Sequence, residues 1–78
     1  MAKAGRPIRF SRLRAGDRLV DKSLADLLPG RRGGLEIVRV NDQSVRIITG
    51  GAGGRVGKRD VLRYYLVERG IRKLRRIR

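Results

Sequence analysis

The sequence has 78 residues and a formal net charge of +14, with 21 Lys and Arg against 7 Asp and Glu. It contains no Cys and no His, which excludes thiolate nucleophiles, disulfides, structural zinc and the usual general base. Because a chain this short buries only about 60% of its unfolded surface, a catalytic cleft would compete with a small core for side chains. The composition therefore favours a binding protein over an enzyme.

The excess of positive charge indicates a polyanionic partner. Arginine accounts for 17 of the 21 cationic residues, and its planar guanidinium group binds two phosphate oxygens at once. No apolar run is long enough to span a membrane, and no basic helix with a broad apolar face is predicted. Met1–Pro7 lacks the apolar stretch of a secretory signal. We therefore expect a cytoplasmic protein that binds nucleic acid.

The first third of the chain predicts a basic arm, a strand and a short helix. Residues 1–7 form the expected flexible arm, and residues 8–78 form a single domain. Alternation over Ile8–Leu13 favours a first strand. Asp21 is a suitable cap for a helix that Pro29-Gly30 would end. The apolar side of this helix would hold Leu24, Leu27 and Leu28.

The clearest prediction is a β-hairpin over about residues 35–49. Leu35–Val40 and Val45–Thr49 are rich in β-branched residues, and the segment between them has the composition of a turn. A loop of either two or four residues gives the same register. The expected core face then holds the pairs Val40–Val45 and Val38–Ile47, and the reverse face holds Ile37–Ile48 and Arg39–Arg46.

The two opposed arginines of this hairpin suggest a binding function. Like charges directly opposite one another on neighbouring strands cost up to about 1 kcal/mol. A phosphate lying across Arg39 and Arg46 would turn that repulsion into a binding site.

The glycine-rich segment that follows, Gly50–Gly54, predicts a mobile surface loop that a polynucleotide backbone can approach closely. It does not match the phosphate loop of nucleotide hydrolases, because Ala52 and Arg59 stand where that loop needs glycine and a hydroxyl. The dinucleotide-binding pattern fails as well, since Val56 occupies the position of its third glycine.

A second helix is predicted after residue 57, with Lys58-Arg59 at its start and Gly70 at its end. Its apolar stripe would consist of Val61, Leu62, Tyr65 and Leu66. Cations at a helix start oppose the macrodipole, so ligand binding rather than helix stability would explain Lys58-Arg59. Residues 72–77 favour a closing strand over a disordered basic tail, although their three-residue apolar spacing also suits a helical turn.

The carboxylates are scattered among turns, caps and helix faces, with no spacing that suggests a catalytic dyad or a metal site. We therefore expect no catalysis, no metal and no cofactor. One Phe and two Tyr are the only aromatic residues, too few for stacking on unpaired bases to be the main mode of recognition. Contacts are expected mostly with phosphate and ribose.

The order of these parts resembles the eukaryotic-type ribosomal protein twenty-two family of the large subunit. The resemblance spans residues 8–78. The matching stretches are Asp17–Asp21, Gly33-Gly34 before Leu35–Val38, Ser44–Thr49, Lys58-Arg59, Tyr65-Leu66, and Ile71-Arg72 with Leu74–Ile77. The chain departs from the family in its shorter helices, its longer glycine segment and its lack of a further C-terminal strand and acidic tail.

The resemblance and the element order together predict an α+β fold. It would consist of a small, mainly antiparallel sheet, centred on the hairpin at about 35–49, with two helices on one face. The resemblance further implies a structural protein bound to ribosomal RNA in the cytoplasm, and the length suits a compact archaeal relative. Neighbouring ribosomal proteins are further expected contacts, whereas a membrane and a small-molecule substrate are not expected.

The residues expected to bind RNA are all basic, and their role would be to hold phosphates, which makes the affinity salt-dependent. They are Arg31, Arg32, Arg39, Arg46, Arg55, Lys58, Arg59, Arg72, Arg75 and Arg76. Two alternatives stay open. An architectural DNA-binding protein of archaeal chromatin would expose an apolar wedge, and none is obvious in the sequence. An adaptor for a polymerase or translation factor would keep its affinity at high salt.

Overall fold

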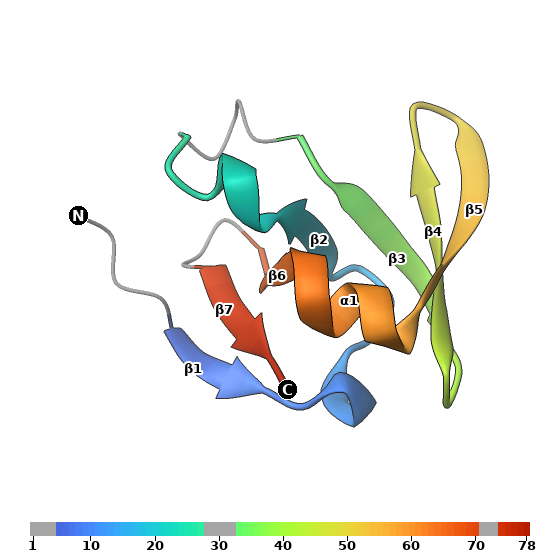
Figure 1. The fold of residues 1–78 in the computed structure, drawn as a ribbon. Coiled ribbons are helices and arrows are strands. Elements are labelled where there is room, and N and C mark those ends of the chain that lie inside the picture. The colour runs from blue at the N-terminus through green and yellow to red at the C-terminus, as the bar shows by residue number, and fades with distance from the viewer. Residues whose placement is uncertain (1–4, 28–32, 71–73) are drawn as a thin grey trace.

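The computed structural model describes residues 5–27, 33–70 and 74–78. In this part of the chain, seven strands form one mixed sheet in the order β1-β7-β6-β2-β3-β4-β5 (Figure 1). Among the strands of the described residues, only β1 and β7 are parallel neighbours. The elements are β1 (Gly5–Ile8), the 3-10 turn η1 (Phe10–Arg12), β2 (Arg18–Asp21), the 3-10 turn η2 (Lys22–Leu24), β3 (Leu35–Val40), β4 (Ser44–Thr49), β5 (Ala52–Gly57), α1 (Lys58–Tyr64), β6 (Tyr65–Glu68) and β7 (Leu74–Ile77).

The expected sheet with two helices on one face is therefore wrong. The described residues contain a single α-helix, and the described part of the first expected helix forms only the turn η2. Leu28 and the expected stop at Pro29-Gly30 lie outside the described residues. Asp21 does cap that turn, because its carboxylate accepts a hydrogen bond from the backbone N–H of Ser23. The residues before the cap form β2, whose Leu19 and Val20 are fully buried. These four residues form a strand because they pair with β3 on one side and β6 on the other. The segment is too short for the sequence to show a strand pattern.

The hairpin of β3 and β4 is confirmed, and so is its pairing of Arg39 with Arg46. Beyond these residues the register shifts, so that Ile37 rather than Val38 lies opposite Ile47. Val38 is the extra residue of a β-bulge. Since a one-residue shift moves side chains to the other face, Ile37 is fully buried while Val38 is 45% exposed. The expected core pair Val38–Ile47 and the expected reverse-face pair Ile37–Ile48 are wrong for this reason, since Glu36 lies opposite Ile48.

The glycine-rich segment is a strand and not the expected loop. Gly50 and Gly51 have φ angles of 55° and 82°, which suit a two-residue hairpin turn that needs positive φ at both positions. The turn places Ala52 opposite Thr49, and β5 then pairs with β4 along its whole length. Backbone hydrogen bonds to β4 hold β5 in place and need no side chains. The high glycine content therefore gave no sign of a strand in the sequence.

The helix α1 begins at Lys58 as predicted but ends at Tyr64, well before Gly70. Tyr65 and Leu66, expected on its apolar stripe, instead open β6, which pairs with β2 at four positions. Val61 anchors the helix and is fully buried. The Nζ of Lys22 donates hydrogen bonds to the carbonyls of Leu62 and Arg63 at 3.3 and 2.9 Å, which satisfies free acceptors at the helix end.

The two ends of the described chain lie together at one side of the sheet (Figure 1). The N–H of Phe10 donates to the carbonyl of Arg78, and the N–H of Arg78 donates to that of Ile8. Residues 5–7, counted in the expected arm, thus belong to β1, and the first strand ends at Ile8 rather than Leu13. The closing strand is confirmed over Leu74–Ile77, against the helical alternative.

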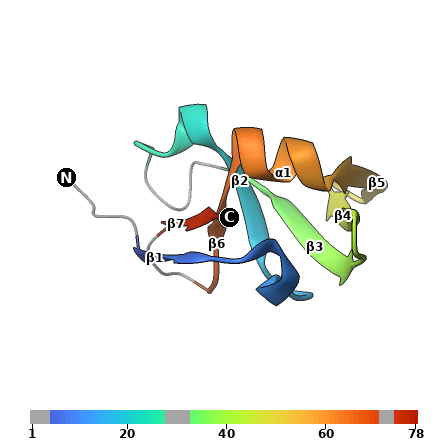
Figure 2. The ribbon, with the colours of Figure 1, turned by 60° about the horizontal axis from the view of Figure 1, so that its bottom comes forward.

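One hydrophobic core joins elements from the whole described chain. Figure 2 shows β1 and β7 at one end of the molecule and β4 with β5 at the other. The core residues come from η1, α1 and most strands, and are Ile8, Phe10, Leu13, Leu19, Ile37, Val45, Ile47, Val61, Val67 and Ile77. No helix in the described ranges is long and apolar enough to cross a membrane.

Candidate nucleic-acid interface

Three arginines lie directly opposite one another on three neighbouring strands. Arg39 on β3 pairs with Arg46 on β4, and Arg46 pairs with Arg55 on β5. All three side chains are exposed. Since neighbouring strands are about 4.8 Å apart, the outer members are separated by about 10 Å across the sheet. We call this set the arginine row.

The arginine row is electrostatically unfavourable for the isolated protein. Each pair of like charges directly opposed across two strands costs a few tenths to about 1 kcal/mol, and the row contains two such pairs. A polyanion laid across β3, β4 and β5 removes this repulsion, because each guanidinium group can then donate paired hydrogen bonds to phosphate oxygens. The arrangement suits a phosphate backbone.

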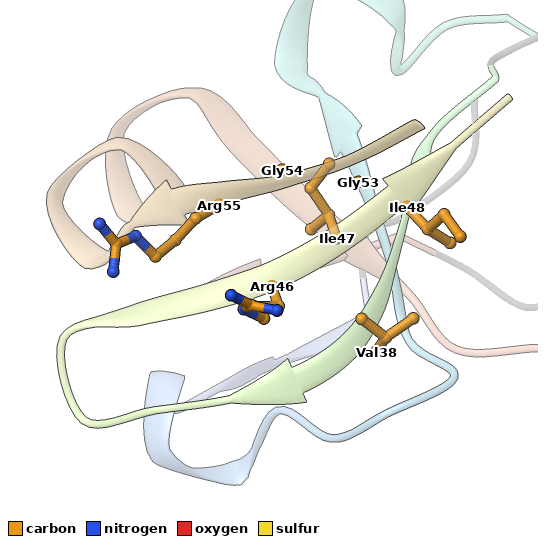
Figure 3. A pocket seen from close by; sticks show the side chains of 7 residues that line it. All are labelled: Val38, Arg46, Ile47, Ile48, Gly53, Gly54 and Arg55. Carbon is orange, nitrogen blue, oxygen red and sulfur yellow. The ribbon is translucent and has the colours of Figure 1, made fainter. Parts of the chain in front are cut away.

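An apolar pair, Val38 and Ile48, lies on the same face as the arginine row. Their side chains are 45% and 40% exposed. With Arg46, Arg55 and the segment around them, they line a hollow of about 550 Å³. Figure 3 shows Arg46 between Arg55 and Val38 at this hollow.

Two glycines of β5 keep the hollow open. Gly53 and Gly54 line it without side chains. A Cβ atom at Gly53 would stand 3.9 Å from the carbonyl oxygen of Ile47, an ordinary contact. Space in the hollow therefore reflects the absence of side chains rather than a backbone that excludes them. Glu36, exposed and opposite Ile48, lies in the next cross-strand row.

The basic residues at the start of α1 differ in their freedom to bind. Lys58 is half-buried, its Nζ lies 5.4 Å from the centre of the Phe10 ring, and its N–H donates to the carbonyl of Gln43. Lys58 thus helps to hold the helix against the core. Arg59 is exposed, and both residues follow β5 directly, close in sequence to Arg55.

The C-terminal candidates lie away from the arginine row. Arg75 is half-buried and its Nε donates to the carbonyl of Arg6 at 2.7 Å. Arg76 is exposed beside a second hollow of about 460 Å³, which Lys22 also lines. Three strands stand between β7 and β4 in the sheet, so these candidates do not join the row. Arg31, Arg32 and Arg72 lie outside the described residues.

An ion pair between Asp17 and Arg69, which the sequence did not reveal, lies at the N-terminal end of β2. Asp17 is 2% exposed and receives hydrogen bonds from Arg69 and from the N–H of Arg14. Burial alone raises the pKa of Asp17, but the hydrogen bonds from Arg69 and Arg14 outweigh it and hold that pKa below its ordinary value. The same contact with Asp17 raises the pKa of Arg69. This pair is structural, since its groups are satisfied by one another.

The described residues contain no group of acidic side chains suited to a metal ion. The apolar pair Val38–Ile48 is the part of the interface that the sequence did not predict, because the bulge that exposes Val38 leaves no mark in the residue pattern. No protein-family model, no curated protein and no solved structure matches this chain.

Proposed function

We propose that this protein binds RNA by holding its phosphate backbone with the arginine row. The observation that carries the proposal is the alignment of three exposed arginines, Arg39, Arg46 and Arg55, on neighbouring strands. A fold selected for stability alone would not oppose like charges twice in one row. The formal charge of +14 extends the same preference to the molecule as a whole.

The RNA that we propose is ribosomal RNA of the large subunit, with the protein acting as a structural, non-enzymatic component in the cytoplasm. The order of motifs in the sequence supports this partner. The two-helix architecture that the resemblance implied is absent from the described residues, so the arginine row carries the binding proposal and the resemblance only names the RNA. Lys58, Arg59, Arg75 and Arg76 would add contacts at other parts of the surface.

The test compares two variants that lose the same charge. One carries Arg39→Gln, Arg46→Gln and Arg55→Gln. The control carries Arg9→Gln, Arg14→Gln and Arg78→Gln, three exposed arginines outside the row. Affinity for ribosomal RNA is measured by fluorescence anisotropy over a range of salt concentrations.

The slope of log affinity against log salt should flatten by about 2 to 3 in the row variant, because each phosphate contact contributes about 0.7 to 0.9. The control should change it by less than about 1. Equal losses in both variants would show that the row is not the binding site. In cell extracts the protein should sediment with large ribosomal subunits at moderate salt, and sedimentation with the chromosome would contradict the ribosomal assignment.

One observation favours a second candidate function, that of an architectural DNA-binding protein. Such proteins insert apolar side chains between base steps, and Val38 and Ile48 are exposed beside the arginine row. Affinities for random duplex DNA and for ribosomal RNA, measured in the same salt, separate the two candidates. Equal or higher affinity for the DNA would favour the second.

A further inference from the structure

The apolar pair on the arginine face has no role in the core and cannot bind phosphate. Val38 is placed outward by the bulge in β3, and Ile48 projects from β4 beside it, where both line the same hollow. Single exposed aliphatic side chains are ordinary on protein surfaces. Two that share a hollow with Arg46 and Arg55 form a surface of mixed character, apolar at its centre and cationic at one side.

We propose that Val38 and Ile48 lie against the minor groove of an RNA double helix while the arginine row holds the adjacent phosphates. This inference rests on the RNA-binding function proposed above and adds the kind of RNA and the groove. The proposed ligand is thus a double-helical segment of folded RNA, which the protein recognises by its shape.

The width of the face favours a wide, shallow groove. The strands β3, β4 and β5 span about 10 Å between their outer members. The minor groove of A-form RNA is wide and shallow and displays riboses. The minor groove of B-form DNA is only about 6 Å wide, so the same face would have to force it open and unstack base steps.

The chemistry of the face also matches a ribose-lined groove. The hollow over Gly53 and Gly54 leaves room for a sugar to approach the backbone. Val38 and Ile48 offer apolar contact to the carbon face of that sugar. The exposed carboxylate of Glu36, opposite Ile48, can accept a hydrogen bond from a 2′-hydroxyl group, which DNA lacks.

Charged side chains flank the apolar pair on both sides. The arginine row lies on one side, and on the other side Glu36 lies opposite both Ile48 on β4 and Arg18 on β2. None of the described residues that line the hollow is aromatic, which argues against capture of unpaired bases by stacking.

The experiment uses three probes, an RNA duplex of about 16 base pairs, a DNA duplex of the same sequence and one RNA strand alone. The first variant carries Val38→Thr and Ile48→Thr, which keep the β-branched shape and replace part of each apolar surface with a hydroxyl group. The second, Gly53→Val, fills the hollow. The control is Leu24→Thr, an exposed aliphatic residue on η2. Circular dichroism and thermal unfolding check that each variant is folded.

The unmodified protein should bind the RNA duplex more tightly than either other probe. Val38→Thr with Ile48→Thr should lower that affinity about ten-fold and leave its salt slope unchanged, since no phosphate contact is lost. Gly53→Val should also lower the affinity for the RNA duplex, and Leu24→Thr should leave that affinity unchanged.

Two results would overturn the inference. One is an unchanged preference for the RNA duplex in the Val38→Thr, Ile48→Thr variant, which would leave the arginine row as the binding site. The other is tighter binding to the DNA duplex together with Val38- and Ile48-dependent bending in a fluorescence energy-transfer assay, which would assign the pair to a DNA wedge. Failure to bind any probe would instead remove the proposed function itself.

Discussion

Arg69 donates two hydrogen bonds to the carboxylate of Asp17, a residue 52 positions earlier in the chain. Its Nε lies 2.8 Å from Oδ1 and its Nη2 lies 2.9 Å from Oδ2. The same Nη2 donates to the carbonyl of Arg12 at 3.2 Å. The contact links the turn before β2 to the segment after β6. It therefore holds these two paired strands together at one end.

The first prediction concerns this ion pair. Asp17→Asn should lower the free energy of unfolding by about 2 kcal/mol, because a hydrogen bond to a charged group is lost at a buried position. Arg69 is 29% exposed and can turn toward water, which keeps the loss below that of a fully buried pair. Urea unfolding near neutral pH measures it. Asp26→Asn, at an exposed carboxylate, is the matched control, and equal stability of the two variants would contradict the prediction.

The pH dependence of stability follows from the same pair. The pKa of Asp17 is lowered in the folded protein from its ordinary value of 3.8, so the folded state favours the charged form. Its contribution is present above the ordinary pKa and is lost as the pH falls through the folded pKa. The stability difference between the unmodified protein and Asp17→Asn should therefore be constant at neutral and mildly acidic pH.

Below about pH 4 the same difference should shrink. The pKa of Asp21 is also lowered, by hydrogen bonds from the hydroxyl and the N–H of Ser23. Asp21 is present in both proteins, so its contribution cancels in the difference between their stabilities. Urea midpoints collected across the acid range provide the measurement. A difference that persists in strong acid would mean that the carboxylate stabilises the fold by packing rather than by charge.

The β4–β5 turn yields a third prediction. Gly51→Ala should cost about 1 to 2 kcal/mol, because its φ of 82° is unfavourable for a residue with a Cβ atom. No atom lies within 4 Å of that Cβ position, so the effect would come from the backbone alone. Gly53→Ala, in the strand and without a positive φ, should be neutral or slightly stabilising. Thermal unfolding compares the two, and a smaller loss at Gly51 than at Gly53 would exclude this turn.

Part of the fold could be predicted because short sequence signals determine it. The turn composition between β3 and β4 predicts the hairpin. The cap at Asp21 is predictable because an aspartate side chain can accept a hydrogen bond from a backbone N–H two residues on, here that of Ser23. The Arg39–Arg46 pair followed from the hairpin register next to that turn. Such features depend on residues close in sequence, so they can be inferred from one chain.

The rest depended on contacts between distant segments. β2 and β6 are four residues each, too short for a periodic pattern, and they are strands because they pair with one another. β5 is rich in glycine and is held by backbone hydrogen bonds to β4. Arg55 was expected to bind phosphate from a loop, and only the β4–β5 pairing places it in line with Arg46. The bulge at Val38 likewise accompanies the burial of Ile37 in a core built from distant segments.

That bulge gives a fourth prediction, which distinguishes the observed register from the expected one. Ile37→Ala should destabilise the fold by about 2 to 4 kcal/mol, since it leaves a cavity at a fully buried position. Val38→Ala should cost well under about 1 kcal/mol, because its side chain is 45% exposed and lies outside the hydrophobic core. Urea unfolding of both variants decides the matter. The opposite order of effects would place Val38 in the core and remove it from the candidate interface.

The last prediction links the arginine row to stability. Replacing Arg39, Arg46 and Arg55 by Gln should raise the free energy of unfolding of the RNA-free protein by about 0.5 to 2 kcal/mol at low salt, since two like-charge cross-strand pairs disappear. Added salt screens exposed charges, so the gain should shrink as the ionic strength rises. The control, with Arg9, Arg14 and Arg78 replaced by Gln, removes the same net charge without a directly opposed pair. It also removes the attraction between Arg14 and the Asp17 carboxylate, so it should gain less. The same row variant is expected to lose RNA affinity, so stability and binding should change in opposite directions. A row variant that is less stable than the unmodified protein at every salt concentration would show that the arginine stems support the sheet by packing, and the argument from repulsion to a bound polyanion would then fail.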